Sequence, residues 1–177
     1  MKFDPEGELD PIDRRILELL QENCKQPLHA IGEKVGLTAS SVMERIHKLE
    51  DVGVILGYSA LLDARALGKD VTAFIGVAIS HPRAVVAFER EMDHTQAVLE
   101  CHHVTGEYTL MLKVKTENTT SLERLIDRFR EQEGVTRTET MVVLSTHIER
   151  VRIPIDPGGA PPPRRGRRAG GRRDLTA

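Results

Sequence analysis

Several residue types are scarce in this sequence, and each scarcity excludes a class of protein. There is no Trp among the 177 residues, and the four Phe and two Tyr are too few to favour nucleic-acid recognition by base stacking. Two cysteines, Cys24 and Cys101, do not make a disulfide scaffold. No apolar run approaches the roughly 20 residues of a membrane-spanning helix. With no secretory leader evident, we expect a cytoplasmic protein without a membrane partner.

Motifs for catalysis and for metal binding are missing as well. The sequence has no Gly-rich phosphate loop and no nucleophile elbow, so we expect no catalytic residue, no cofactor and no enzyme activity. Cys101-His102-His103 offers candidate metal ligands, but only Cys101 and His103 would share one face of a strand. Two ligands do not make a structural zinc site, so we expect no metal.

The formal net charge of −2 conceals an uneven distribution. Residues 157–177 contain six arginines and one acidic residue and carry +5, which leaves −7 on residues 1–156, with 19 basic and 26 acidic groups. An acidic body argues against broad nonspecific attraction to DNA. The Pro-, Gly- and Arg-rich segment 157–177 cannot form a core. We expect a disordered tail whose arginines contact phosphates, the alternative being a solubilising extension.

The most informative segment, residues 28–48, reads as two short helices joined by a tight turn. Gly36 comes after the apolar positions of the first of these helices, where a left-handed helix-ending residue is needed. Thr38 can cap a second helix over residues 39–51. Upstream, Asp10 caps and Pro11 begins a bracing helix that continues to about Gln21. This order predicts a helix-turn-helix, and hence DNA binding.

The second helix of that motif has an apolar and a polar stripe. A step of 100° per residue places Val42, Ile46 and Leu49 toward a core. The adjoining stripe, expected to face solvent, consists of Ser41, Glu44, Arg45 and Lys48. Arg45 can bind guanine edges or phosphates through two nitrogens, while Lys48 adds a point charge. The alternative is an amphipathic helix whose polar face is only solvated.

The rest of the chain is predicted to form a connector and a second domain. Residues 54–62 look like a strand or small wing that completes a DNA-binding domain over 9–62, and residues 63–70 form a linker. From residue 71 to 150 the pattern predicts β-α-β-β-α-β, the ferredoxin-like fold of the α+β class. Its elements are expected at 71–80, 82–92, 98–105, 108–115, 119–131 and 135–145.

The strands of this second domain are apolar on both faces. In residues 73–79 and again in 110–112 and 141–144, apolar side chains occupy consecutive positions instead of alternating with polar ones. Two helices cover only one face of a four-stranded sheet. We therefore expect the other face to meet a second copy of the chain, in a dimer that assembles further.

Several motifs, in order, resemble those of the Lrp/AsnC (leucine-responsive, feast/famine) family of transcription factors. The resemblance runs from about Leu9 to Glu149 and implies an N-terminal winged helix-turn-helix followed by a ferredoxin-like regulatory (RAM) domain. The motifs that carry it are Leu9-Asp10-x-x-Asp13-x-x-Ile16-Leu17, Val35-Gly36-Leu37-Thr38, Arg45-x-x-x-Leu49-Glu50, Gly53-x-Ile55-x-Gly57-Tyr58, Val104-Thr105-Gly106-Glu107-Tyr108 and Gly134-Val135-x-x-x-Glu139-Thr140.

The resemblance also implies the residues of two sites. Near DNA it places the polar residues around the second motif helix, which are Thr38, Ser40, Ser41, Glu44, Arg45 and Lys48. At an amino-acid effector cleft it places Gly106, Glu107, Tyr108, Thr109, Glu139 and Thr140. Members usually carry two acids in this turn, whereas this chain has Glu107 and then Thr109, so a hairpin turn without a ligand is the alternative.

Three functions are thus open at the level of sequence. The favoured one is a sequence-specific regulator that binds double-stranded DNA as a dimer, octamer or higher oligomer, is associated with the nucleoid, and responds to an amino acid. The second is an architectural DNA-packaging protein with little sequence preference. The third, a small-molecule enzyme built on a ferredoxin-like domain, has no acid-base constellation to support it.

Overall fold

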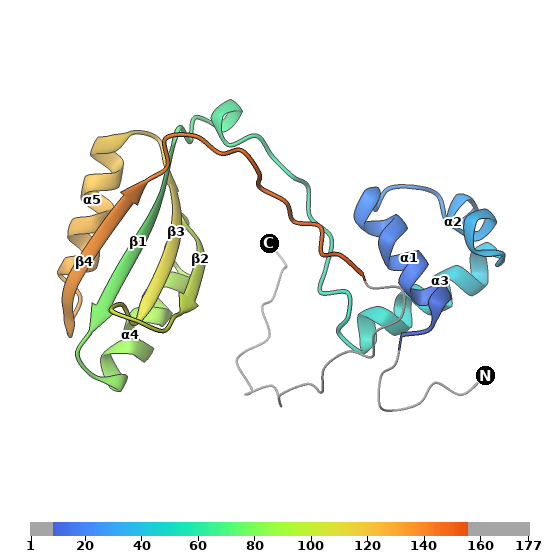
Figure 1. The fold of residues 1–177 in the computed structure, drawn as a ribbon, viewed down its shortest axis with the longest axis horizontal. Helices are drawn as coiled ribbons and strands as arrows, with labels where there is room; N and C mark the ends of the chain where they lie inside the picture. Colours follow the sequence, from blue (N-terminus) through green and yellow to red (C-terminus); the bar gives the residue numbers. More distant parts are fainter. Residues whose placement is uncertain (1–8, 156–177) are drawn as a thin grey trace. The chain divides into compact units, whose positions relative to one another are not determined.

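The computed structural model describes residues 9–155 and divides them into two compact units (Figure 1). One unit comprises residues 9–59 together with 150–155, and the other comprises residues 60–149. The first contains helices α1 (Pro11–Glu22), α2 (Leu28–Val35) and α3 (Ala39–Asp51). The predicted tail, residues 157–177, lies outside the described residues.

Local contacts fix the starts of α1 and α3 and the end of α2, as the sequence predicts. Asp10 caps α1 by accepting a hydrogen bond from the Asp13 N–H at 2.7 Å, and Pro11 occupies the first turn. Gly36 ends α2 with φ of 71°. Thr38 caps α3 by accepting from the Ser41 N–H at 3.2 Å. The helices enclose a core that includes Ile16, Leu19, Ile31, Val42 and Ile46.

The predicted wing is wrong in this structure. Gly53, with φ of 71°, ends α3, and the backbone N–H groups of Val54 and Ile55 both donate to Leu49 O. From there to residue 62 the chain forms no strand, and Leu56 and Leu61 are about four-fifths exposed. A strand needs a neighbour to satisfy its backbone groups, and all strands assigned within residues 9–155 belong to the other unit's sheet.

The second unit has the predicted β-α-β-β-α-β order, preceded by a short 3₁₀ turn at Arg65–Leu67. The strands run antiparallel in the spatial order β2-β3-β1-β4, which confirms the ferredoxin-like arrangement. The bounds are β1 (Val71–Ile79), α4 (Pro82–Asp93), β2 (Val98–His103), β3 (Leu110–Thr116), α5 (Thr119–Arg130) and β4 (Val135–Val142).

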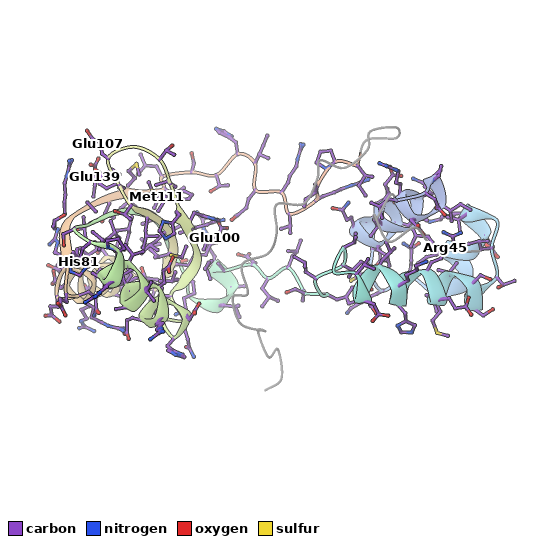
Figure 2. The ribbon with its side chains drawn as sticks, turned by 90° about the horizontal axis from the view of Figure 1, so that it is seen from below. Arg45, His81, Glu100, Glu107, Met111 and Glu139 are labelled. Carbon is purple, nitrogen blue, oxygen red and sulfur yellow. The ribbon has the colours of Figure 1, made fainter. Side chains whose placement is uncertain are left out.

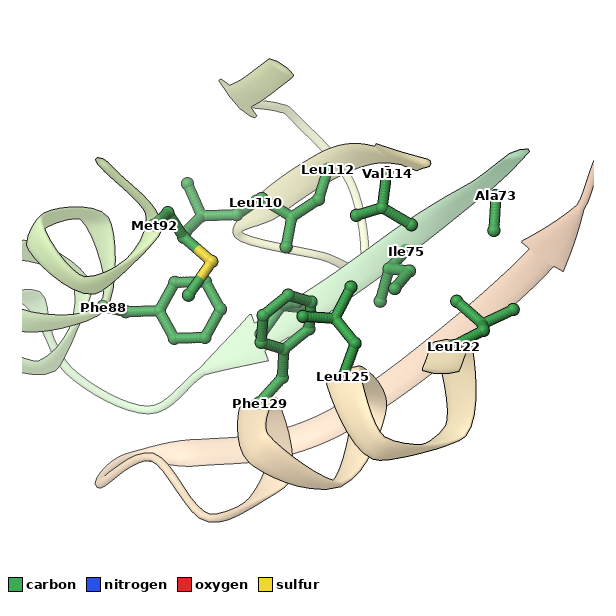
Figure 3. Packing of buried hydrophobic residues seen from close by; sticks show 11 residues of the cluster. Ala73, Ile75, Phe88, Met92, Leu110, Leu112, Val114, Leu122, Leu125 and Phe129 are labelled. Atoms are coloured by element: carbon green, nitrogen blue, oxygen red, sulfur yellow. The ribbon is translucent and has the colours of Figure 1, made fainter. Parts of the chain in front are cut away.

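Both helices of this unit pack on one face of the sheet. Ile75 of β1 and Leu112 of β3 are fully buried beneath them, and Figure 3 shows these side chains meeting those of α4 and α5. Phe88 of α4 and Phe129 of α5 contact each other edge to face, with ring centroids 5.7 Å apart. The shared cluster ties both helices to the same face of the sheet.

The opposite face of the sheet carries an apolar patch. Phe74, Met111 and Met141 occupy this face on the three adjacent strands β1, β3 and β4, and Phe74 and Met141 are 37% and 46% exposed. Beside the patch, Lys113 forms ion pairs with Glu100 and Glu149. The apolar side chains of the sheet are thus covered by helices on one face only. Within residues 9–155, no helix is both long and apolar enough to cross a membrane.

Candidate DNA-binding face and effector site

The turn into α3 brings α2 and α3 close together. A Cβ atom on Gly32 would lie 2.4 Å from Leu37 O, so the absence of a side chain lets the turn pass directly over α2. Thr38 Oγ1 lies 3.0 Å from the hydroxyl oxygens of both Ser40 and Ser41. Three hydroxyl groups therefore gather at the N-terminus of α3, where the helix dipole and unpaired N–H groups favour an anion such as phosphate.

Arg45 does not lie where the sequence predicts. Its Nη1 atom donates to Asp10 Oδ2 at 2.6 Å and to Asp13 Oδ1 at 2.7 Å, and its side chain is 23% exposed. The expectation that its guanidinium faces solvent is wrong, because both carboxylates lie at the start of α1, which packs against this flank of α3. Arg45 thus joins the first helix to the third (Figure 2 labels its position).

Burial and hydrogen bonding shift the pKa values of Asp10 and Arg45 in this contact. Burial raises the pKa of the Asp10 carboxyl, but the hydrogen bonds from the Asp13 N–H and from Arg45 outweigh it and leave the pKa below its ordinary value of 3.8. The hydrogen bond to Asp10 raises the pKa of Arg45. Among the described residues, Asp13 Oδ2 is buried without a hydrogen-bond partner, while Asp13 Oδ1 forms the ion pair with Arg45.

The exposed face of α3 differs from the predicted stripe by part of a turn. Ser41 and Lys48 are half-buried on the same flank as Arg45, whereas Glu44 is exposed. Met43 and His47, which sequence reasoning missed, are exposed as well, and the His47 side chain is 66% accessible. The spacing of 3.6 residues from Ser40 through residues 43, 44 and 47 could have identified them. We call Ser40, Met43, Glu44 and His47 the outer face of α3.

The predicted effector turn connects β2 and β3. Gly106 has φ of 114°, a backbone conformation that side chains disfavour. Thr109 N–H donates to Val77 O at 2.9 Å, and Thr109 Oγ1 accepts from the Ile79 N–H at 3.1 Å. Thr109 thus fastens the turn to β1.

Tyr108 and Glu139 meet across the sheet, as two of the predicted effector residues. The Tyr108 ring lies over Gly76, where a Cβ atom would come within 2.7 Å of it, and its hydroxyl donates to Glu139. That hydrogen bond raises the pKa of Tyr108. Glu139 is opposite Gly76 in the β1–β4 register. Because Gly76 has no side chain, the Tyr108 ring can cross β1 at this position and reach Glu139.

Arg137 completes this cluster, although it belongs to none of the residues expected there from the sequence. Its guanidinium lies 3.1 Å from Glu139 and 3.6 Å from Glu107, and 5.4 Å from the centre of the Tyr108 ring. Figure 2 shows Glu107 and Glu139 near each other at one end of the sheet. The spacing of two residues from Glu139 along β4 was the available signal. We call Glu107, Tyr108, Arg137 and Glu139 the turn cluster.

Thr140 is not part of the turn cluster. It pairs with Ile75, whose side chain lies among the helices, and therefore faces the side of the sheet away from Glu139. The imidazoles of His102 and His103 contact different carboxylates. His102 Nε2 lies 3.2 Å from Glu100 Oε2, and His103 Nε2 lies 2.8 Å from Glu89 Oε1. No group of three or more metal-binding side chains occurs within residues 9–155.

Both units match known protein families. Residues 9–50 match the AsnC-type helix-turn-helix domain, and residues 72–153 match the Lrp/AsnC ligand-binding domain. The HTH-type transcriptional regulator FL11 of Pyrococcus furiosus is 34% identical over 149 residues, covering 84% of this chain and 98% of that protein. The regulator LrpA of Mycobacterium tuberculosis is 31% identical, covering 82% and 97%.

Solved structures agree with this result. A transcriptional regulator of Neisseria meningitidis in complex with L-Met superposes with a TM-score of 0.79 at 28% identity, covering 82% of this chain and 96% of that one. The feast or famine regulatory protein of M. tuberculosis complexed with L-methionine gives 0.76 at 30% identity, covering 82% and 98%.

A helix-turn-helix followed by a ferredoxin-like ligand-binding domain defines a class of transcriptional regulators that bind DNA. The chain belongs to the Lrp/AsnC family of that class.

Proposed function

We propose that this protein is a sequence-specific transcriptional regulator that binds operator DNA as a homodimer or higher oligomer and responds to an amino acid. The outer face of α3 carries the proposal, because it presents four exposed side chains on a helix held by the Arg45 contacts. We place the protein in the cytoplasm, associated with the nucleoid, where its DNA is found.

Recognition is assigned to the outer face of α3 and the hydroxyl cluster before it. Thr38, Ser40 and Ser41 contact phosphates at the N-terminus of α3, and Lys48 adds charge on the flank. Met43, Glu44 and His47 reach base edges in the major groove, where Glu44 accepts a hydrogen bond from cytosine. Arg45 takes part by orienting α3 on α1.

The apolar patch of the sheet supports dimer formation. Phe74, Met111 and Met141 would remain partly in water in a single copy, whereas a second copy of the sheet would bury them. A twofold dimer presents two copies of α3, which read half-sites one helical turn apart, about 10–10.5 base pairs.

The turn cluster is the proposed effector site. An α-amino acid carries one ammonium and one carboxylate group, and the cluster offers carboxylates at Glu107 and Glu139 and a guanidinium at Arg137. Gly106 allows backbone N–H groups to approach the ligand carboxylate. Two relatives are solved with methionine bound, which supports an amino acid as the ligand class.

Footprinting on genomic DNA tests the function. Discrete protected sites at moderate salt, with affinity that changes on addition of one amino acid, are expected. Uniform coverage would instead identify an architectural packaging protein. Calorimetry with each of the twenty amino acids tests the effector separately, and no heat together with no change in oligomer size would refute it.

A further inference from the structure

The chain that leaves α3 folds back onto the last turn of that helix. Gly53 ends the helix with φ of 71°, and the next two backbone N–H groups both donate to Leu49 O, at 2.9 Å and 3.0 Å. After this turn the hydroxyl of Tyr58 donates to Glu50 Oε1 at 2.8 Å. The segment that follows α3 is therefore fastened to the helix that carries the outer face.

The second oxygen of the same carboxylate contacts a residue of the outer face. Glu50 Oε2 lies 3.2 Å from Nδ1 of His47, which is three positions earlier on α3. The Glu50 side chain is only 34% exposed, against 66% for His47. Each oxygen of Glu50 thus has one partner, so three side chains form a continuous series of hydrogen bonds. We call His47, Glu50 and Tyr58 the α3 network.

The chemistry of the α3 network determines which groups donate. An ionised carboxylate only accepts, so the hydrogen of the contact with Glu50 lies on Nδ1 of His47. In the neutral ring Nε2 is then an acceptor, and no group of residues 9–155 is hydrogen-bonded to it. Burial and the hydrogen bond to Glu50 raise the pKa of Tyr58 to about 12, so its hydroxyl remains a donor at neutral pH.

We infer that Glu50, held by Tyr58, is a positioning residue for base recognition, which keeps the hydrogen of His47 on Nδ1 so that Nε2 accepts a hydrogen bond from the exocyclic amino group of adenine or cytosine. The inference rests on the proposed DNA binding by the outer face and deepens it. In the major groove such amino donors are adenine N6 and cytosine N4. An imidazole with its hydrogen on Nε2 would instead donate to guanine or thymine, so the contact with Glu50 determines the base preference of His47.

Removal of one amino group from the operator tests the assigned contact. Selection from a random DNA pool, with the unmodified chain and with His47→Ala, first identifies the base pair whose preference depends on His47. Purine in place of the adenine, or pyrimidin-2-one in place of the cytosine, then removes only the amino group. Affinity for this operator should fall about two- to tenfold for the unmodified chain, the value of one hydrogen bond, and remain unchanged for His47→Ala.

Glu50→Gln tests the positioning role. The amide nitrogen can donate to Nδ1 and thereby move the ring hydrogen to Nε2, so this variant should lose most of its dependence on the amino group. Preferences at the other operator positions should persist. Combining Glu50→Gln with His47→Ala should cause no further loss at this base pair, because both changes remove the same contact.

Asp51→Asn is the matched control for Glu50→Gln. It makes the same change from acid to amide at the next residue of α3, which is exposed, and therefore alters the charge near DNA equally. This variant should keep the full dependence on the amino group.

Tyr58→Phe tests the support of Glu50 while keeping the aromatic ring. Without the hydroxyl, Glu50 is less restricted, so the dependence on the amino group should decrease, by less than in Glu50→Gln. In the Glu50→Gln background the same change should have no further effect on it. An unaltered dependence in Tyr58→Phe would overturn the part assigned to Tyr58.

The outcomes separate this inference from the proposed function. If Glu50→Gln lowers affinity at every operator position, equally with and without His47, its role is structural and the inference is overturned. Unchanged affinity of the unmodified chain for the operator without the amino group, or no altered base preference in His47→Ala, overturns it as well. Failure of the unmodified chain to prefer any duplex overturns the proposed function itself.

Discussion

Arg45 of α3 and Asp13 of α1 form an ion pair at 2.7 Å in which the carboxylate is only 1% exposed. The two residues are 32 positions apart, and they connect the helix that braces the unit with the helix that carries the outer face. A charge buried to this degree is stabilised only while its partner is present. The pair therefore adds a charged contact between α1 and α3 to the apolar core that the two helices share.

Arg45→Ala is expected to destabilise the DNA-binding unit by about 2–3 kcal/mol, because it leaves the Asp13 carboxylate buried without a counter-charge. Chemical denaturation monitored by a helix signal measures this. Combining the change with Asp13→Ala should cost less than the sum of the single changes, since the second removes the orphaned charge. Additive losses would show that the two residues are not coupled.

Acid pH should weaken the same contact. The folded state holds the pKa of Asp10 below 3.8, so the carboxylate stabilises the fold above that pH and this contribution disappears as the pH falls through the lowered value. Asp10→Asn keeps a helix cap but cannot ionise. The stability difference between the unmodified chain and Asp10→Asn should shrink between about pH 5 and pH 2. A difference independent of pH would contradict this assignment.

His47→Ala is expected to lower operator affinity by about 1–3 kcal/mol, the usual value of one base contact, while unfolding stays unchanged. The reason is that His47 projects from the outer face of α3 and is 66% exposed. Electrophoretic mobility shift at fixed salt measures the effect. His29→Ala, also exposed but on α2, serves as the control, and equal losses in both variants would show that the outer face has no special role.

Met141→Lys should dissociate the proposed dimer, because it places a charge in the apolar patch. Val86→Lys is a close control, since Val86 is 49% exposed on α4, against 46% for Met141, and lies on the other side of the sheet. Sedimentation at micromolar concentration is expected to give monomers for the first variant and the native oligomer for the second. Native-size particles from both would place the interface elsewhere.

Glu139→Gln is expected to weaken amino-acid binding about tenfold, because it removes the negative charge of the carboxylate that the Tyr108 hydroxyl and Arg137 both contact. DNA affinity without amino acid should not change. Calorimetry measures the first and mobility shift the second. Glu133→Gln is the control, an exposed residue between α5 and β4. Unaltered amino-acid affinity in Glu139→Gln would show that the turn cluster is not the effector site.

The helix boundaries were predictable because the signals that determine them are local. Asp10 and Thr38 cap the helices that begin directly after them, and Gly36 ends the helix before it. The wing was not predictable in the same way. Residues 54–62 have a strand-like composition, but a strand also requires a partner, and composition does not reveal whether one is present.

In the candidate sites, too, features that depend on local sequence were predictable and contacts between distant residues were not. Helical periodicity correctly placed Val42, Ile46 and Leu49 in the core, yet it could not show that Asp13, far away in sequence, would reach Arg45. The meeting of Tyr108 with Glu139 depends on β1 lying between their strands and on Gly76 lying under the ring. Contacts of this kind depend on the tertiary fold, and spacing within one element does not determine them.

Selection of bound duplexes from a random DNA pool, with the unmodified chain and the triple variant Ser40→Ala, Met43→Ala, His47→Ala in parallel, tests the central claim most directly. For the unmodified chain we expect a motif of two related half-sites about one helical turn apart, and for the variant we expect loss of base preference within those half-sites. The same motif in both selections, or no motif in either, would contradict recognition through the outer face of α3.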